Sequence, residues 1–238
     1  MKQRVSRLAY AATVWFSRGV VYWLGRWEVV GRDRVPSAGP VILVANHNHL
    51  LDPPLVAASC GRRVHPMAKR ELFETPFVGW YFWVYGAFPV RRFSGDMGAL
   101  RVARNYLRNG EVVLMFPEGT RAHGRGMRAA LPGAAMVALL SHAPVVPVAI
   151  TATDTIRIPL VFVQWLIGRR PRLRVEFGEP FSLESGEADA RSAEESTDRM
   201  MRRVAAMLPE RYQGAYGAAS AGTIVVARQS RDRRAPSE

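Results

Sequence analysis

The sequence predicts an α/β fold: a single domain with a largely parallel, mixed sheet flanked by helices and preceded by an N-terminal amphipathic helical segment. Short apolar runs of strand length alternate with helix-length segments along most of the chain, which is typical of a buried parallel sheet. The length of 238 residues suits one domain with a tail, and 48% hydrophobic residues supply a core. Charged residues amount to 22%, so wholesale disorder and a multi-span membrane protein are excluded.

The first segment, residues 1–26, mixes aromatic and basic side chains in blocks. Its uncharged stretches are shorter than the roughly 20 residues that a spanning helix needs, and no small-residue cleavage site follows them. Two interpretations stay open. The segment is either an interfacial helix, with aromatic rings at the depth of the lipid headgroups, or a surface helix packed on the body. The residues concerned are Arg7, Trp15, Phe16, Arg18, Tyr22, Trp23 and Arg26.

The body, residues 27–212, is expected to alternate strands and helices. Strands are predicted at Trp27–Val30, Val41–Ala45, Val64–Ala68, Ala87–Arg91, Val112–Phe116, Val145–Ile150 and Leu173–Phe177. Helices are predicted at Asp52–Ser59, Pro76–Tyr85, Met97–Arg108, Gly133–His142 and Ala193–Leu208.

Local signals support these boundaries. Asp52 before two prolines predicts a helix start with the aspartate as its cap. The uncharged run 129–153 is interrupted by three prolines, so it indicates a buried helix followed by a strand, and no membrane span. From residue 213 the composition turns to Gly, Ala, Ser and Arg, which predicts a basic, disordered tail over 213–238.

Charge is the unusual property of the composition. The chain has 33 Lys and Arg against 20 Asp and Glu, a net charge of +13, and Lys2 and Lys69 are the only lysines. Such a balance indicates a polyanionic partner: nucleic acid, an anionic membrane or a phosphorylated small molecule. The guanidinium fork suits phosphate. The single cysteine, Cys60, excludes an internal disulfide and a multi-cysteine zinc site, and its apolar surroundings predict a core residue.

The densest polar signal is the run NHNHLLD at residues 46–52, between an expected strand and an expected helix. In open α/β sheets, sites form at the carboxyl ends of strands. A histidine beside an aspartate there can act as a general base, because the carboxylate holds one ring nitrogen and stabilises the imidazolium. His47 and Asp52 are the candidates. The alternative is that Asp52 only caps a helix and His47 is an ordinary loop residue.

Two other site chemistries fit less well. His47-x-His49 resembles the start of the metal-binding run of the metallo-β-lactamase fold, but the aspartate falls one residue late and Pro53 stands where the next histidine should be. Since few histidines remain to complete a site, we expect no metal. A serine hydrolase lacks support because the chain has no Gly-x-Ser-x-Gly elbow.

The second signal is FPEGTR at residues 116–121, directly after the most apolar predicted strand. Gly119 allows backbone amides to approach an anion, Thr120 adds a hydroxyl and Arg121 supplies a forked cation. Taken alone, the hexapeptide is equally an ordinary turn at the end of a strand. No Gly-x-x-x-x-Gly-Lys sequence is present, so a nucleotide P-loop is not supported.

The two signals together closely resemble the glycerolipid acyltransferases of the 1-acylglycerol-3-phosphate type. The resemblance runs in order and spacing from about Trp27 to Pro180. Its blocks are Asn46-His47-x4-Asp52, Lys69-x-Glu71-Leu72, Pro76-Phe77-x-Gly79-Trp80, Gly86 to Arg92, Phe116 to Arg121, and Val146-Pro147-Val148. His49 stands where many members carry serine.

The resemblance implies roles for particular residues. His47 is the general base that takes the proton from an acceptor hydroxyl, and Asp52 orients and charges its imidazole without a covalent acyl-enzyme. Glu118 fixes the acceptor or the surrounding loop, and Pro147 shapes the acyl-donor side. The full set implied in substrate binding is Lys69, Arg92, Glu118, Gly119, Thr120, Arg121 and Pro147.

The expected function is transfer of a fatty acyl group from acyl-CoA or acyl carrier protein to a lysophospholipid, with 1-acyl-sn-glycerol 3-phosphate giving phosphatidic acid. No cofactor is expected beyond this acyl donor, and no nucleic-acid partner. Other acceptors stay open: glycerol 3-phosphate, a glycosylated phospholipid or an amino-lipid. The rival from a different class is a non-catalytic Arg-rich protein that binds nucleic acid or membrane.

An anionic membrane surface is the other expected partner, with the protein peripheral or monotopic on the cytoplasmic face of the cell membrane. Besides the N-terminal segment, residues 158–168 combine apolar side chains with flanking arginines and are a second candidate for contact with lipid. Residues 73–88 hold eight of the 23 aromatic residues, which indicates burial in the core or against acyl chains.

Overall fold

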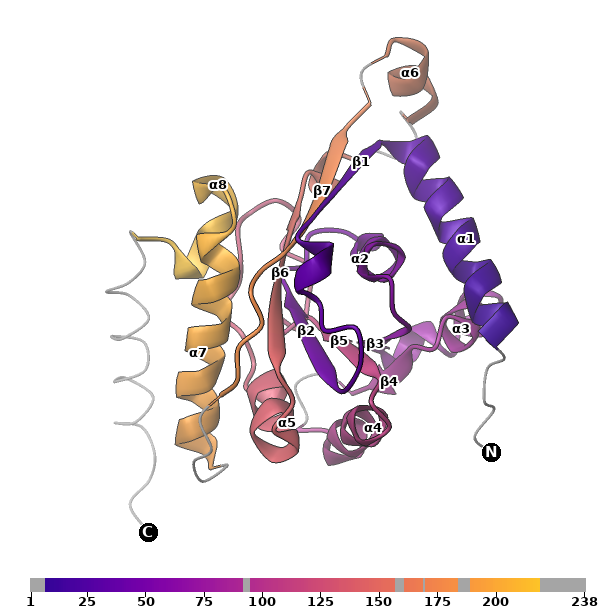
Figure 1. Cartoon of the computed structure of the whole chain (residues 1–238). Coiled ribbons are helices and arrows are strands. Elements are labelled where there is room, and N and C mark those ends of the chain that lie inside the picture. The colour runs from indigo at the N-terminus through magenta and orange to yellow at the C-terminus, as the bar shows by residue number, and fades with distance from the viewer. Residues whose placement is uncertain (1–6, 92–94, 157–160, 169, 184–188, 219–238) are drawn as a thin grey trace.

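A computed structural model describes residues 7–91, 95–156, 161–168, 170–183 and 189–218. Within these ranges, a seven-stranded sheet in the order β1-β7-β6-β2-β5-β3-β4 separates two layers of helices (Figure 1). Neighbouring strands are parallel except β6 and β7, so the sheet is mixed and largely parallel, as predicted. The strands are β1 (Arg26–Val30), β2 (Val41–Ala45), β3 (Val64–Lys69), β4 (Phe88–Val90), β5 (Val112–Met115), β6 (Val145–Thr151) and β7 (Arg172–Phe177).

Helices cover both faces of the sheet because the central strands are apolar on both sides. In β2, Val41 and Leu43 pack with α1 and α2, whereas Ile42 and Val44 pack with α4, α5 and α7. The helices are α1 (Arg7–Leu24), α2 (Asp52–Cys60), α3 (Val78–Val84), α4 (Met97–Arg108), α5 (Gly133–Ser141), α6 (Val161–Leu166), α7 (Ala190–Ala206) and α8 (Glu210–Gln213). Cys60 is buried among the apolar side chains on the face of the sheet that α1 and α2 cover, as predicted.

The start of α2 differs from the prediction. Leu51, and not Asp52, is the N-cap, and no side chain caps the helix. Asp52 is the first helical residue, and its carboxylate turns back toward the preceding loop. The reason lies in Pro53 and Pro54, which lack the N–H groups that a cap would satisfy. The carboxylate is thus available for the loop.

The N-terminal helix α1 packs on the body, as the second interpretation of its sequence predicted. One face packs on the body, with Val21 and Leu24 buried and Ser17 Oγ 2.8 Å from the hydroxyl of Tyr81 in α3. The other face leaves Trp15 and Phe16 exposed. No helix in the described part of the chain is long and apolar enough to cross a membrane.

The folded body extends further toward the C-terminus than its composition indicates. After α8, residues 214–216 form a short 3-10 turn, and the ring of Tyr216 packs into the cluster beneath α7. The predicted boundary at residue 212 is therefore too early, because a single tyrosine in a Gly- and Ala-rich stretch does not register in composition. Residues 219–238 of the predicted tail lie outside the described residues.

Candidate active site

The candidate site lies where β2 and β5 end at the carboxyl edge of the sheet. Asn46, directly after β2, ties this strand to β6 with its side-chain amide: Nδ2 donates to the carbonyl of Ile150 at 2.9 Å, and Oδ1 accepts from the N–H of Ile150 at 2.8 Å. Sequence reasoning gave Asn46 no role. The sequence feature that could have indicated a role for Asn46 is its position, as a polar residue directly after the five apolar residues of β2. This clip fixes the backbone that leads into His47.

His47 and Asp52 form a buried pair. His47 Nδ1 lies 2.8 Å from Asp52 Oδ2, and the same oxygen accepts the N–H groups of Asn48 at 2.6 Å and His49 at 2.7 Å. The carboxylate is completely buried. An oxygen that already accepts two backbone donors can only accept from the ring, so Nδ1 carries the hydrogen. His47 Nε2 is then the basic nitrogen.

His49 does not compete for this role. Its N–H donates to Asp52, while its ring Nδ1 accepts the N–H of Leu51 at 3.3 Å. Burial lowers the pKa of His49, and the neighbouring Asp52 opposes this effect in part. The geometry therefore supports His47, rather than His49, as the base.

The main chain of His47 is held by the FPEGTR segment. Its N–H donates to Glu118 Oε1 at 2.9 Å, and its carbonyl accepts the N–H of Ala122 at 2.7 Å. The Phe116 ring stacks on the imidazole with centroids 4.3 Å apart. The two sequence signals therefore meet in space, because β2 and β5 are neighbours in parallel register.

Glu118 links two loops. Besides His47, it accepts the N–H of Arg128 at 2.8 Å through Oε2, and only 2% of the residue is exposed. Both carboxylate oxygens thus bond to the backbone, which supports a role in fixing the surrounding loop over direct contact with the acceptor. Burial raises the pKa of Glu118 to about 7, against the lowering effect of these two hydrogen bonds.

The raised pKa of Glu118 predicts a pH-dependent stability. The folded protein holds the Glu118 proton more tightly than the unfolded chain, whose glutamate pKa is 4.5, so this contribution is full below pH 4.5 and is lost as the pH rises through 7. The measured quantity is the difference in unfolding free energy between the wild type and Glu118→Gln. From pH 4.5 to about pH 7, this difference should fall by up to about 1.4 kcal/mol per pH unit. Urea unfolding from pH 5 to 8.5 measures it. A difference that stays flat or rises would contradict the prediction.

Residues 119–121 continue from Glu118 into an open loop. Gly119 has φ of 66°, which side chains rarely adopt, and its N–H donates to the carbonyl of Phe116 at 3.0 Å. Thr120 is half-buried and Arg121 is exposed. Arg121 directly precedes Ala122, whose N–H donates to the carbonyl of His47, so the backbone of Arg121 lies near that of His47.

The other predicted residues lie differently. Lys69 ends β3 and its ammonium is 3.2 Å from Glu71 Oε1. Pro147 is buried within β6, opposite Val44, and not at the carboxyl edge. Arg92 lies outside the described residues. Across the described part of the chain, no three His, Cys, Asp or Glu side chains form a group that could hold a metal ion.

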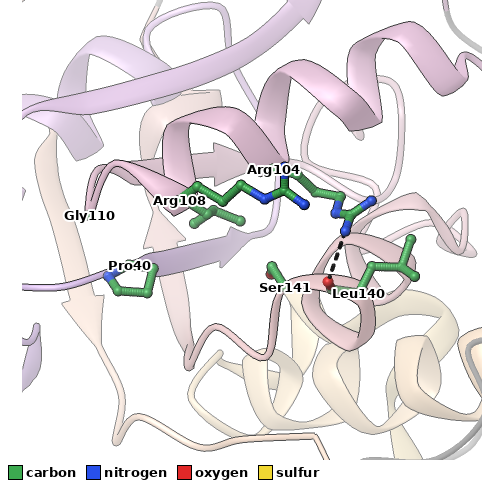
Figure 2. A pocket seen from close by; sticks show the side chains of 7 residues that line it. Pro40, Arg104, Arg108, Gly110, Leu140 and Ser141 are labelled. Carbon is green, nitrogen blue, oxygen red and sulfur yellow. Dashed lines mark hydrogen bonds between the residues drawn. The ribbon is translucent and has the colours of Figure 1, made fainter.

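A cavity of about 330 Å³ lies away from these residues (Figure 2). Pro40 and Gly110, which precede β2 and β5, place it at the amino ends of the strands, opposite His47. Arg104 lines it and donates to the carbonyl of Leu140 near the end of α5 at 3.3 Å. This arginine therefore satisfies a carbonyl at a helix C-terminus.

The family comparison agrees with this arrangement. A family model described as Acyltransferase matches residues 26–151, more than half of the chain, and includes both His47 and Arg121. The chain belongs to the acyltransferase family. Within this family, the matched region begins at β1 and ends at β6, so it contains His47, Asp52, Glu118 and the strands that precede them.

Several relatives in the acyltransferase family carry a more specific name. The 1-acyl-sn-glycerol-3-phosphate acyltransferase of Streptococcus pneumoniae is 30% identical over 71% of this chain and 62% of its own length. The enzyme of the same name from Bacillus subtilis is 28% identical over 52% and 62%, and the human alpha form 33% over 53% and 46%. The chain thus spans less than two thirds of these relatives.

A solved structure of this family shares the fold. The crystal structure of the 1-acyl-sn-glycerophosphate acyltransferase PlsC from Thermotoga maritima matches with a TM-score of 0.64 and 25% sequence identity. The match covers 83% of this chain and 79% of that one. It supports the α/β architecture with a mostly parallel sheet.

Proposed function

We propose that the protein transfers a fatty acyl group from an acyl thioester to the free hydroxyl of 1-acyl-sn-glycerol 3-phosphate, giving phosphatidic acid. The observation that carries the proposal is the buried Asp52 carboxylate on His47 Nδ1, at the carboxyl edge of the sheet, with the exposed Arg121 in the loop that follows β5. The names of the relatives support the choice of acceptor.

In the proposed reaction, His47 carries one proton from the acceptor hydroxyl to the leaving thiolate. His47 Nε2 takes the proton of the acceptor hydroxyl while the oxygen attacks the thioester carbonyl carbon. Asp52 stabilises the imidazolium, which stays fixed because Glu118 and Ala122 hold its backbone. When the tetrahedral intermediate collapses, the C–S bond breaks and the leaving thiolate takes the proton from the imidazolium. The acyl donor is acyl-CoA or acyl carrier protein, and the step as written needs no further cofactor.

The proposal is tested by an acceptor screen with a labelled acyl thioester. Purified protein receives acyl-CoA or acyl carrier protein in separate arms, with 1-acyl-sn-glycerol 3-phosphate, glycerol 3-phosphate, a glycosylated phospholipid or an amino-lipid as acceptor. We expect labelled phosphatidic acid from the first acceptor, and none with His47→Ala. Equal labelling of several of these acceptors by the wild type and by His47→Ala would refute the mechanism.

Arg121 is proposed to hold the acceptor's phosphate. In Arg121→Ala, the KM for 1-acyl-sn-glycerol 3-phosphate should rise about tenfold or more, because a charged hydrogen bond contributes about 1.5–3 kcal/mol. The KM for the acyl donor and kcat should change far less. Arg125→Ala is the matched control, since Arg125 is an exposed arginine of the same loop. An equal rise of KM in both variants would indicate a general charge effect.

We further propose that α1, α3 and α6 dock on the membrane interface, on the cytoplasmic side, where anionic lipids attract arginine. Ser17 Oγ contacts the hydroxyl of Tyr81 in α3, and Arg170, which follows α6, donates to the carbonyl of Tyr22 in α1. The helix α1 thus contacts α3 at Ser17 and the segment after α6 at Tyr22 (Figure 1). Their exposed apolar side chains are Leu8, Trp15, Phe16, Tyr22, Trp23, Phe77, Val78, Trp80, Trp83, Val163, Trp165, Leu166 and Ile167. This concentration of exposed apolar side chains on three helices supports an interaction site.

Removal of two of these rings should weaken membrane binding. Trp15→Ala with Phe16→Ala is expected to lower the affinity for phosphatidylglycerol-containing vesicles at least about tenfold, because each exposed ring loses apolar contact with lipid. Vesicle flotation measures the bound fraction. The control replaces Met97 and Val102, exposed apolar residues of α4 on the other side of the sheet, by alanine. Equal losses in both double variants would refute the assigned surface.

A further inference from the structure

The loop that carries Arg121 is held from one side by the C-terminal segment of the chain. The N–H of Met127 donates to the carbonyl of Tyr212 at 2.8 Å, and the carbonyl of Met127 accepts the N–H of Ala215 at 2.8 Å. The N–H of Ala130 donates to the hydroxyl of Tyr216 at 3.0 Å. The two segments are far apart in sequence, since Ala130 and Tyr216 are separated by 86 residues.

We propose that residues 210–217, here called the C-terminal strap, position the 119–131 loop for the acceptor's phosphate, and that Gly214 and Tyr216 are positioning residues. The strap lies beyond the region that the family model matches, which ends at residue 151. The inference rests on the proposed function, because its main test measures the KM for a phosphorylated acceptor.

The loop needs support from outside because its own backbone is irregular. It contains no helix or strand between Pro117 and Leu131. Several of its residues adopt left-handed conformations, including the non-glycine His123 with φ of 52°. Such conformations persist only where surrounding structure imposes them. On one side, Glu118 and Ala122 bond to His47, and on the other side Met127 and Ala130 bond to the strap.

The strap and the loop meet through two glycines. A Cβ atom on Gly126 would lie 2.7 Å from the Cα of Gly214, and a Cβ on Gly214 would lie 2.6 Å from the carbonyl carbon of Gly126. Both residues have positive φ, 80° and 48°. These contacts are with backbone, which cannot move aside as a flexible side chain can. The approach of the two segments therefore requires glycine at both positions.

Tyr212 extends the same support to β6. Its hydroxyl donates to Asp154 Oδ1 at 2.7 Å and accepts the N–H of Ala152 at 3.1 Å. Ala152 has φ of 66°, a further conformation that neighbours must impose. Ala152 lies two residues after Ile150, whose backbone makes both hydrogen bonds with the side chain of Asn46. The strap therefore braces both segments that flank His47.

The strap is tested with two pairs of matched variants. Gly214→Ala places a methyl against the backbone of Met127, whereas Gly217→Ala in the same segment meets only ordinary contacts of 3.4 Å or more. Tyr216→Phe removes the hydroxyl that accepts from Ala130. Tyr10→Phe removes an equally buried hydroxyl that accepts from Val64 at 3.0 Å, away from the loop.

We expect the KM for 1-acyl-sn-glycerol 3-phosphate to rise about tenfold in Gly214→Ala and about threefold in Tyr216→Phe. The KM for acyl-CoA should stay within about twofold. Hydrogen exchange of the Met127 and Ala130 amides should accelerate about tenfold in Gly214→Ala, while the Ala122 amide keeps its protection. Gly217→Ala and Tyr10→Phe should match the wild type in acceptor KM and in these exchange rates.

Unchanged acceptor KM and unchanged exchange at Met127 and Ala130 in Gly214→Ala and Tyr216→Phe would overturn the proposal. A parallel fall of kcat, both affinities and Tm would also overturn it, because the strap would then be only a part of the core. If the wild type acylates no phosphorylated acceptor, the proposed function fails. The exchange rates of the two amides then decide by themselves whether the strap holds the loop.

Discussion

Replacing His47 by alanine is expected to lower kcat for acyl transfer about a thousandfold, with the fold intact. The loss is large because Nε2 of this ring is the proposed base for the acceptor hydroxyl, and general base catalysis contributes about 10²–10⁴ in rate. The fold should survive because the backbone N–H and carbonyl of residue 47 make their bonds to Glu118 and Ala122 without the side chain. Steady-state kinetics with labelled acyl-CoA and a thermal unfolding curve measure both quantities.

His49→Ala separates the two imidazoles of this segment. Its ring accepts only the N–H of Leu51 among the bonds described, while its own N–H to Asp52 stays in place after the substitution. We expect less than about a tenfold loss of kcat. If His49→Ala is as inactive as His47→Ala, the base is wrongly assigned.

Asp52→Asn is expected to damage both catalysis and stability. One carboxylate oxygen accepts from His47 Nδ1, Asn48 N and His49 N, and an amide oxygen without charge accepts these donors more weakly. The ring is then free to take the wrong tautomer, which should lower kcat about a thousandfold. The buried donors also lose a charged partner, which should lower the unfolding free energy by about 2–4 kcal/mol.

Asp189→Asn provides the control for this substitution. Asp189 caps α7 by accepting the N–H of Ser192 at 2.7 Å, so its carboxylate, like that of Asp52, accepts a hydrogen bond from the backbone. Unlike Asp52, it lies on the surface and away from the site. It should keep full kcat. Urea unfolding and steady-state kinetics of the two variants decide the matter. An Asp52→Asn variant as stable and as active as Asp189→Asn would contradict both roles assigned to Asp52.

Local signals in the sequence were enough for most elements. The helix predicted at Met97–Arg108 is found with these bounds, since Asp96 accepts the N–H of Ala99 at its start and Gly110 adopts φ of 72° just after its end. Where a local conformation broke the pattern, the prediction failed. The helix predicted from Pro76 begins at Val78, because Phe77 has φ of 60°.

Contacts between distant segments were beyond the reach of local patterns. Residue spacing placed His47 and Arg121 at the ends of two strands, but only the pairing of β2 with β5 brings those ends together. The burial of Glu118 against two backbone N–H groups, and the bond from Ala130 to Tyr216, leave no trace in spacing or composition. Such contacts depend on topology rather than on the pattern of neighbouring residues.

The pairing of β1 sets an order of events during synthesis. Among the described strands β1 pairs only with β7, and the ion pair between Glu28 and Arg174 that bridges them joins residues 146 positions apart. Of the described strands, the one translated first is therefore the last to find its neighbour, whereas β2, β3, β4 and β5 can assemble once Met115 has emerged. Throughout that interval α1 is already translated, so the membrane contact proposed for it does not have to wait for the complete sheet.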